Sequence, residues 1–214
     1  MTCVNTKRWL FTDMLGVKQF WQTIDITSST PRSILLEFQN NPTNVSRTFS
    51  GGFENIYTWF AYIRYHVEFT LEVQSTFQQQ GLMALRTFPY RRMPFTNLAR
   101  FFGLQAMTVP GTVSDELRFT TILPHDFITL GHNGTYVLTL PWTCNRLVLP
   151  VVSNEQSNAA GPILTAYSLN TMQLVCCVPM QIVAGGNDSA TFKFWIRLTE
   201  MELDGYRGMG YITS

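Results

Sequence analysis

The segment Arg64-Tyr-His-Val-Glu-Phe-Thr-Leu-Glu-Val-Gln74 alternates between apolar and polar residues without a break. A repeat of two residues is typical of a β-strand that buries one face and exposes the other. The face that we expect to be buried consists of Tyr65, Val67, Phe69, Leu71 and Val73. We therefore predict one long strand here, packed against a hydrophobic core.

The segment from Thr191 to Thr199 has the same alternation, with Phe192, Phe194, Ile196 and Leu198 on its apolar face. We expect this second long strand to end the domain. Shorter apolar or β-branched runs lie at Ser33–Phe38, Gly81–Phe88, Phe127–Leu130, Tyr136–Leu140 and Leu174–Val183. Many short strands separated by Gly, Pro and Asn clusters indicate an all-β sandwich or barrel.

Two glycine-rich segments are interpreted as hairpin turns between consecutive strands. Gly131-His-Asn-Gly134 contains an Asn-Gly pair, which tolerates the positive φ angles of tight turns. Ala184-Gly-Gly-Asn-Asp188 has a similar composition and precedes the last strand.

Two segments are candidates for short helices. Phe53 to Ile63 carries aromatic and aliphatic residues at helical spacing and would lead directly into the first long strand. Phe95 to Leu104 could begin at a capping Thr96 or Asn97 and end at Gly103, although a long loop fits the same residues.

The composition indicates a single domain whose surface is covered by partners. The chain has 214 residues, which suits one large β domain. Charged residues make up only 14%, against roughly 25% in ordinary soluble domains. The net charge is +1, so the chain lacks the basic field of a dedicated nucleic-acid-binding protein. Lys7 and Arg8 are the candidates for a weak contact with RNA phosphates, and solvated surface is the alternative for this pair.

The sequence predicts no metal, no cofactor and no catalytic site. The four cysteines form no CxxC pair, and His66, His125 and His132 lack the spacing of metal ligands. His125-Asp126 is an ordinary polar pair at a strand entry, and no nucleophile elbow, zinc-protease motif or phosphate loop is present. No apolar run is long enough for stable membrane insertion.

A secreted carbohydrate- or receptor-binding β-sandwich is the alternative interpretation. Three formal glycosylation sequons support it, at Asn44, Asn133 and Asn187. The N-terminus leads into no signal-like apolar segment, however, and turns are rich in these residue types. Glycans on these turns would favour secretion.

The order of the motifs resembles the capsid-protein domain of picornaviruses and of their insect-virus and marine-virus relatives. In that family a short aromatic helix leads into a strand, as Tyr57-Thr-Trp-Phe-Ala-Tyr-Ile-Arg-Tyr-His-Val-Glu-Phe-Thr-Leu71 does here. A Gln-Gln-Gln-Gly turn and strand follow in Phe77-Gln-Gln-Gln-Gly-Leu-Met-Ala-Leu85. Proline and histidine precede a strand in Leu123-Pro-His-Asp-Phe-Ile128, and a strand ends in Val137-Leu-Thr-Leu-Pro-Trp142.

The resemblance implies an all-β, eight-stranded antiparallel jelly-roll β-sandwich of the viral capsid type, with one or two short helices in loops. It divides the chain into an N-terminal arm (1–22), a jelly-roll domain (23–203) and a C-terminal tail (204–214). The implied function is that of a major capsid protein in a small, non-enveloped icosahedral RNA virus. The implied partners are homologous capsid proteins, packaged genomic RNA and an unidentified host receptor, with assembly in the host cytoplasm.

Overall fold

The computed structural model describes residues 16–41, 44–45, 48–49, 60–88, 124–144, 147–150, 170–183 and 185–206. This part of the chain contains nine β-strands: β1 (Gln19–Thr27), β2 (Ile34–Asn40), β3 (Phe60–Gln74), β4 (Gln79–Phe88), β5 (His125–Thr129), β6 (Gly134–Leu140), β7 (Leu149–Pro150), β8 (Asn170–Ile182) and β9 (Ser189–Tyr206). All paired strands are antiparallel.

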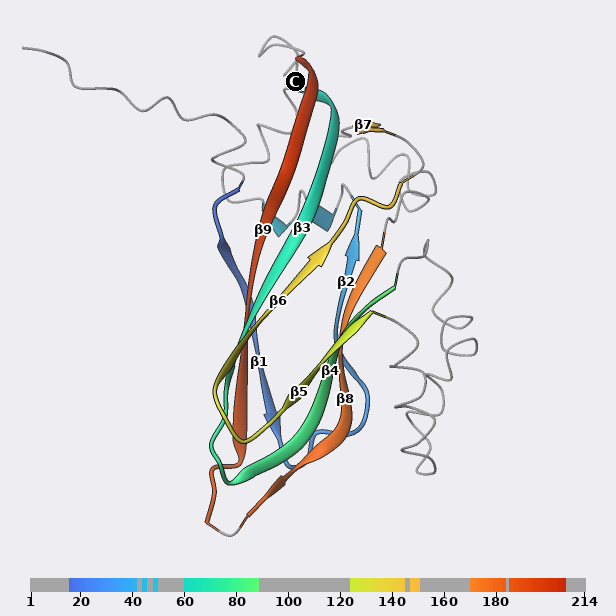
Figure 1. The fold of residues 1–214 in the computed structure, drawn as a ribbon. Helices are drawn as coiled ribbons and strands as arrows, with labels where there is room; N and C mark the ends of the chain where they lie inside the picture. Colours follow the sequence, from blue (N-terminus) through green and yellow to red (C-terminus); the bar gives the residue numbers. More distant parts are fainter. Residues whose placement is uncertain are drawn as a thin grey trace, which may run out of the picture.

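The strands form two sheets that pack face to face (Figure 1). The first sheet has the order β1-β9-β3-β6, and the short β7 pairs with the N-terminal end of β3. The second sheet has the order β2-β8-β4-β5. Eight strands in two sheets of four form a jelly roll. The predicted fold class is therefore confirmed, with two-residue β7 as an addition.

The connections from β1 to β2, β3 to β4, β5 to β6 and β8 to β9 each pass from one sheet to the other. The prediction of two hairpins was therefore wrong. The segment at 131–134 joins β5, which pairs with β4, to β6, which pairs with β3. The segment at 184–188 joins β8 to β9 in the same manner, so both are connections between sheets.

The core lies between the two sheets and contains the side chains that the alternation predicted. Tyr65, Val67, Phe69 and Leu71 are fully buried, and Val73 is nearly so. Phe192, Phe194, Ile196 and Leu198 of β9 belong to the same cluster. Cys176 lies in this cluster, whereas Cys177 lies in a small second cluster. The two adjacent cysteines thus point to opposite faces, as the strand geometry predicted.

The first predicted helix was wrong where it can be compared with the structure. Residues 60–63 begin β3, because the long β9 pairs with them as far as Phe60 opposite Tyr206. Residues 53–59 and the second candidate helix, Phe95 to Leu104, lie outside the described residues. A helical turn that the sequence analysis missed follows β2, where the N–H groups of Val45 and Phe49 donate to the carbonyls four residues earlier. The Asn41 side chain caps this turn by accepting from the Asn44 N–H at 2.8 Å.

Two strands extend past the expected limits of the domain. β1 begins at Gln19, so the last residues assigned to the arm belong to the sheet. β9 continues to Tyr206, so the first residues assigned to the tail are also strand.

Candidate functional site

The outer face of the β1-β9-β3-β6 sheet carries a row of side chains that crosses all four strands. Phe20 of β1 stands opposite Trp195 of β9, which stands opposite Thr70 of β3, which stands opposite Val137 of β6. Phe20 and Val137 are 53% and 56% exposed, whereas Thr70 is buried between its neighbours. Phe20 and Trp195 pack edge to face at 5.5 Å between ring centroids. We call Phe20, Trp195, Thr70 and Val137 the outer row.

Charged residues on either side of the outer row are matched within the chain. The Arg197 guanidinium donates to both carboxylate oxygens of Glu68 at 2.7 and 2.8 Å. Hydrogen bonding to this carboxylate raises the pKa of Arg197 above its ordinary value. On the other side, Lys193 of β9 stands opposite Glu72 of β3. This face therefore offers little unmatched charge to a ligand.

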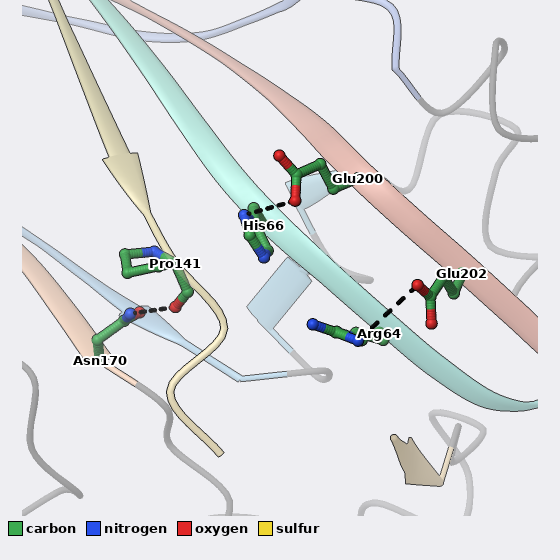
Figure 2. A network of polar contacts seen from close by, with 6 residues as sticks. All are labelled: Arg64, His66, Pro141, Asn170, Glu200 and Glu202. Carbon is green, nitrogen blue, oxygen red and sulfur yellow. Dashed lines mark hydrogen bonds and ion pairs between the residues drawn. The ribbon is translucent and has the colours of Figure 1, made fainter. Parts of the chain in front are cut away.

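Two further contacts join β3 to β9 toward the end of the sheet (Figure 2). The Arg64 guanidinium lies 3.8 Å from the Glu202 carboxylate, and His66 Nδ1 lies 3.5 Å from Glu200 Oε2. Glu200 has a φ of 47°, and the register between the strands shifts between Arg64 and His66. A bulge therefore directs the Glu200 side chain toward His66.

The loops at the opposite end of the sandwich are joined by hydrogen bonds. The Ser75 N–H donates to Asn133 Oδ1 at 3.0 Å, and the Ser28 N–H donates to Asp188 Oδ1 at 3.0 Å. Hydrogen bonding to the Ser28 side chain and backbone lowers the pKa of Asp188. Gln79 is fully buried, and its Nε2 donates to the carbonyls of Asn187 and Ser189. The predicted Gln-Gln-Gln-Gly turn is shorter than expected, because Gln79 and Gln80 already belong to β4.

A buried polar row crosses the outer face of the other sheet. Gln173 of β8 donates to the Glu37 carboxylate of β2 at 2.7 Å and accepts from the Arg86 guanidinium of β4 at 3.2 and 3.3 Å. Arg86 is fully buried, and this desolvation lowers its pKa to about 10 despite an opposing charge interaction with Cys177. The row fixes the register of three strands through side-chain contacts.

A second buried polar contact joins the two sheets near the end of β6. The Asn40 side chain of β2 donates to Asn170 of β8 at 2.8 Å. Asn170 in turn donates to the Pro141 carbonyl at 2.7 Å, and Figure 2 shows this second bond. Pro141 follows β6 of the first sheet, so the contact links the sheets across the core. Asn44, the asparagine of the first formal glycosylation sequon, uses its side-chain amide within the fold, because this amide donates to the Gln39 carbonyl.

The residues that the sequence analysis considered for chemistry lie apart. Lys7 and Arg8 lie outside the described residues. His66 lies on β3 in the first sheet, His125 begins β5 in the second, and exposed His132 lies in the loop between β5 and β6. Because His125 and Asp126 are adjacent in a strand, their side chains point to opposite faces. Within the described ranges, no group of His, Cys, Asp and Glu is arranged to hold a metal ion.

Several structural side chains were not identified from the sequence. Gln79, Arg86 and Gln173 are buried polar residues in segments where polarity suggested exposure. The partners of Arg86 and Gln173, and two of the three partners of Gln79, are distant in the sequence, so no local pattern marks these residues. Among the residues described, no helix is long and apolar enough to cross a membrane.

The comparisons with known proteins agree with this architecture. Residues 13–166 match the family model described as picornavirus capsid protein. A search of curated proteins finds no match. Among solved structures, the chain is similar to sacbrood virus of honeybee (16% identity, TM-score 0.67, covering 92% of this chain and 76% of that chain). It is also similar to a full particle of Israeli acute paralysis virus heated to 63 degrees (16%, 0.69, 94% and 79%) and to mud crab dicistrovirus (16%, 0.67, 100% and 82%). At this level of identity the solved structures establish the fold alone.

Proposed function

This chain belongs to the picornavirus capsid protein family, and from that premise we propose that it forms a closed icosahedral shell together with homologous jelly-roll subunits. A capsid protein is a structural component of the virion and not an enzyme. The observation that carries the proposal is the family match over residues 13–166, which contains β1 to β7, and the chain completes the two four-stranded sheets with β8 and β9. The secreted sandwich is not favoured by this match.

The physical properties of the chain support a role as a building block. A buried contact between Asn40 and Asn170 joins β2 to β8, and the bond from Asn170 to the Pro141 carbonyl joins the two sheets, which favours a rigid unit. The charged fraction of 14% is low, which reduces the desolvation penalty when a large surface is buried against other subunits. Rigid units also lose little conformational entropy on assembly.

We further propose that the shell forms in the host cytoplasm around genomic RNA. Contact with the RNA would be weak and independent of sequence, with Lys7 and Arg8 as the candidate phosphate contacts. A host receptor would bind exposed loops of the assembled particle.

The proposed function is tested by co-expressing the chain with the homologous capsid proteins of the same virus. Negative-stain electron microscopy of the purified material should show uniform icosahedral particles. Mass spectrometry of the same particles should show that they contain this chain. A chain that stays monomeric when these capsid proteins are present would contradict the proposal.

A further inference from the structure

The loop between β5 and β6 contains the one Asn-Gly pair of the sequence, Asn133-Gly134. An asparagine before glycine is chemically unstable, because the backbone nitrogen of the next residue attacks the side-chain amide and glycine has no Cβ to hinder the approach. Asn133 is exposed and lies just outside the strand, and Gly134 is the first residue of β6. A nucleophile and solvent water therefore both have access to this amide.

The contacts of Asn133 favour attack on its side-chain carbonyl carbon. The Ser75 N–H donates to Asn133 Oδ1 at 3.0 Å, and a donor at this oxygen stabilises the negative charge that develops there when a nucleophile adds to the carbon. Ser75 is itself fixed to the loop, because its Oγ donates to the His132 carbonyl and accepts from the Gly131 N–H. Asn133 Nδ2 makes no hydrogen bond within the described part of the chain, so the nitrogen that must leave is not held by the fold.

Asn187 provides an internal comparison, because it is also exposed and also lies in a loop that connects the two sheets. The residue after it is Asp188, whose side chain restricts the backbone and whose carboxylate already accepts from the Ser28 N–H at 3.0 Å. Asn40 and Asn170 are buried. The combination of exposure, a donor at Oδ1 and a following glycine is thus specific to Asn133 among these asparagines.

We propose that Asn133 is a site of spontaneous deamidation in the folded subunit, with the Gly134 nitrogen as nucleophile and water as co-reactant. The Gly134 nitrogen bonds to Asn133 Cγ and loses its proton to solvent, and the bond from Cγ to Nδ2 breaks with release of ammonia. Water then opens the resulting cyclic imide at either carbonyl, which yields aspartate or isoaspartate at this position. No atom is oxidised or reduced.

The two products differ in their effect on the fold. Aspartate keeps the contact with Ser75, because a carboxylate oxygen accepts from an N–H group. Isoaspartate adds one methylene group to the main chain directly before Gly134, which pairs with Val73 of β3. In the described part of the chain β6 is an end strand of its sheet, so β3 alone holds it there. Isoaspartate should therefore weaken the first pairs of β6, and the reaction limits the chemical lifetime of the subunit.

The test incubates the folded full-length chain in isotopically labelled water at pH 8, digests it in ordinary water and analyses the peptide that contains Asn133 by mass spectrometry. We expect labelled oxygen to enter at Asn133 at least about tenfold faster than at Asn187, because only Asn133 precedes a glycine. Gly134→Ala should slow the reaction at Asn133 by roughly tenfold. Gly134 lies outside the left-handed φ region, and an added Cβ would meet a ring carbon of Tyr136 at 3.1 Å, so the substitution requires only a small shift of this ring.

Three outcomes would overturn the proposal. Conversion in the chain unfolded in urea but not in the folded chain would show that the loop protects Asn133. Product without labelled oxygen would have formed during digestion, and equal rates at Asn133 and Asn187 would remove the role of the glycine. If Gly134→Ala does not fold, the comparison between the two asparagines of the unmodified chain decides. The measurement requires no assembled particles, so its result is independent of the proposed function.

Discussion

At the scale of single residues, Gln79 has a role that only the folded chain reveals. Its side chain is fully buried and joins the first residue of β4 to Asn187 and Ser189 at the start of β9 through two donated hydrogen bonds. Its Oε1 also accepts from the Thr76 N–H at 2.9 Å. One amide group thus provides hydrogen bonds to three backbone groups, at the end of the sandwich where the chain passes from one sheet to the other.

Replacing Gln79 by glutamate should be strongly destabilising, because a carboxylate oxygen would then face two carbonyl oxygens that lose their donor. We expect a loss of roughly 2–4 kcal/mol in the free energy of unfolding at pH 7. The loss should decrease toward pH 5, because a protonated carboxyl group can again donate. Urea denaturation at both pH values measures it. Gln80→Glu, the same change at the exposed neighbouring position, is the control, and equal losses in both variants would contradict the role of Gln79.

Asp188 gives a prediction for acidic conditions. Hydrogen bonds from Ser28 lower its pKa in the folded state, so its stabilising effect is complete above the ordinary aspartate range and disappears as the pH falls through the lowered pKa. Asp188→Asn should therefore lose less stability than the unmodified chain on acidification from pH 5 to below pH 3. Melting temperatures across this range provide the measurement, with exposed Asp126→Asn as the control. A variant that follows the unmodified curve would show that the Ser28 contact has no energetic effect.

At the scale of elements, the bulge at Glu200 allows β9 to pair with β3 over its full length. Glu200 adopts a left-handed conformation, which is unfavourable by about 1 kcal/mol for most residues other than glycine and asparagine. Glu200→Asn should raise stability by about 0.5 kcal/mol, and β-branched Glu200→Val should lower it by about 2 kcal/mol. Chemical denaturation measures both.

The matched control is Glu200→Gln, which keeps the backbone strain and removes only the charge that faces His66. It should change stability by less than about 0.5 kcal/mol at pH 7.5, because the Glu200 carboxylate is largely exposed to solvent and such a pair contributes little. If Glu200→Gln and Glu200→Asn behaved alike, side-chain charge rather than backbone conformation would determine the energy of the bulge.

The strands were predictable from the sequence to the extent that their signal is local. The alternation in Tyr65 to Val73 and in Phe192 to Leu198 identified both long strands and their buried faces. The segment at 131–134 was misassigned because its composition specifies a turn, whereas the partners of the strands on either side are set by distant residues. For the same reason, no sequence pattern brings Thr70, Trp195 and Val137 into one row.

At the scale of the whole molecule, the numbers of positive and negative residues are nearly equal. The chain has 15 Lys and Arg residues against 14 Asp and Glu residues. Cross-strand pairs such as Arg197 and Glu68 use some of these cations within the fold. The capacity for RNA contact is therefore small and must come from local groups of basic residues. Lys7-Arg8 and Arg91-Arg92 are the two tight basic pairs.

These two pairs make the RNA proposal testable by substitution. For single-stranded RNA, each phosphate contact contributes about 0.7 to the slope of log K against log salt concentration. Replacing both Lys7 and Arg8 by alanine should therefore reduce the magnitude of this slope by about 1.4, whereas replacing Arg91 and Arg92 should leave it unchanged. Fluorescence anisotropy with a labelled oligonucleotide over a salt series measures the slope for both double variants. If the two variants lost equally, binding would reflect general charge rather than a contact in the arm, and an effect confined to Arg91 and Arg92 would transfer the RNA-facing role to that segment.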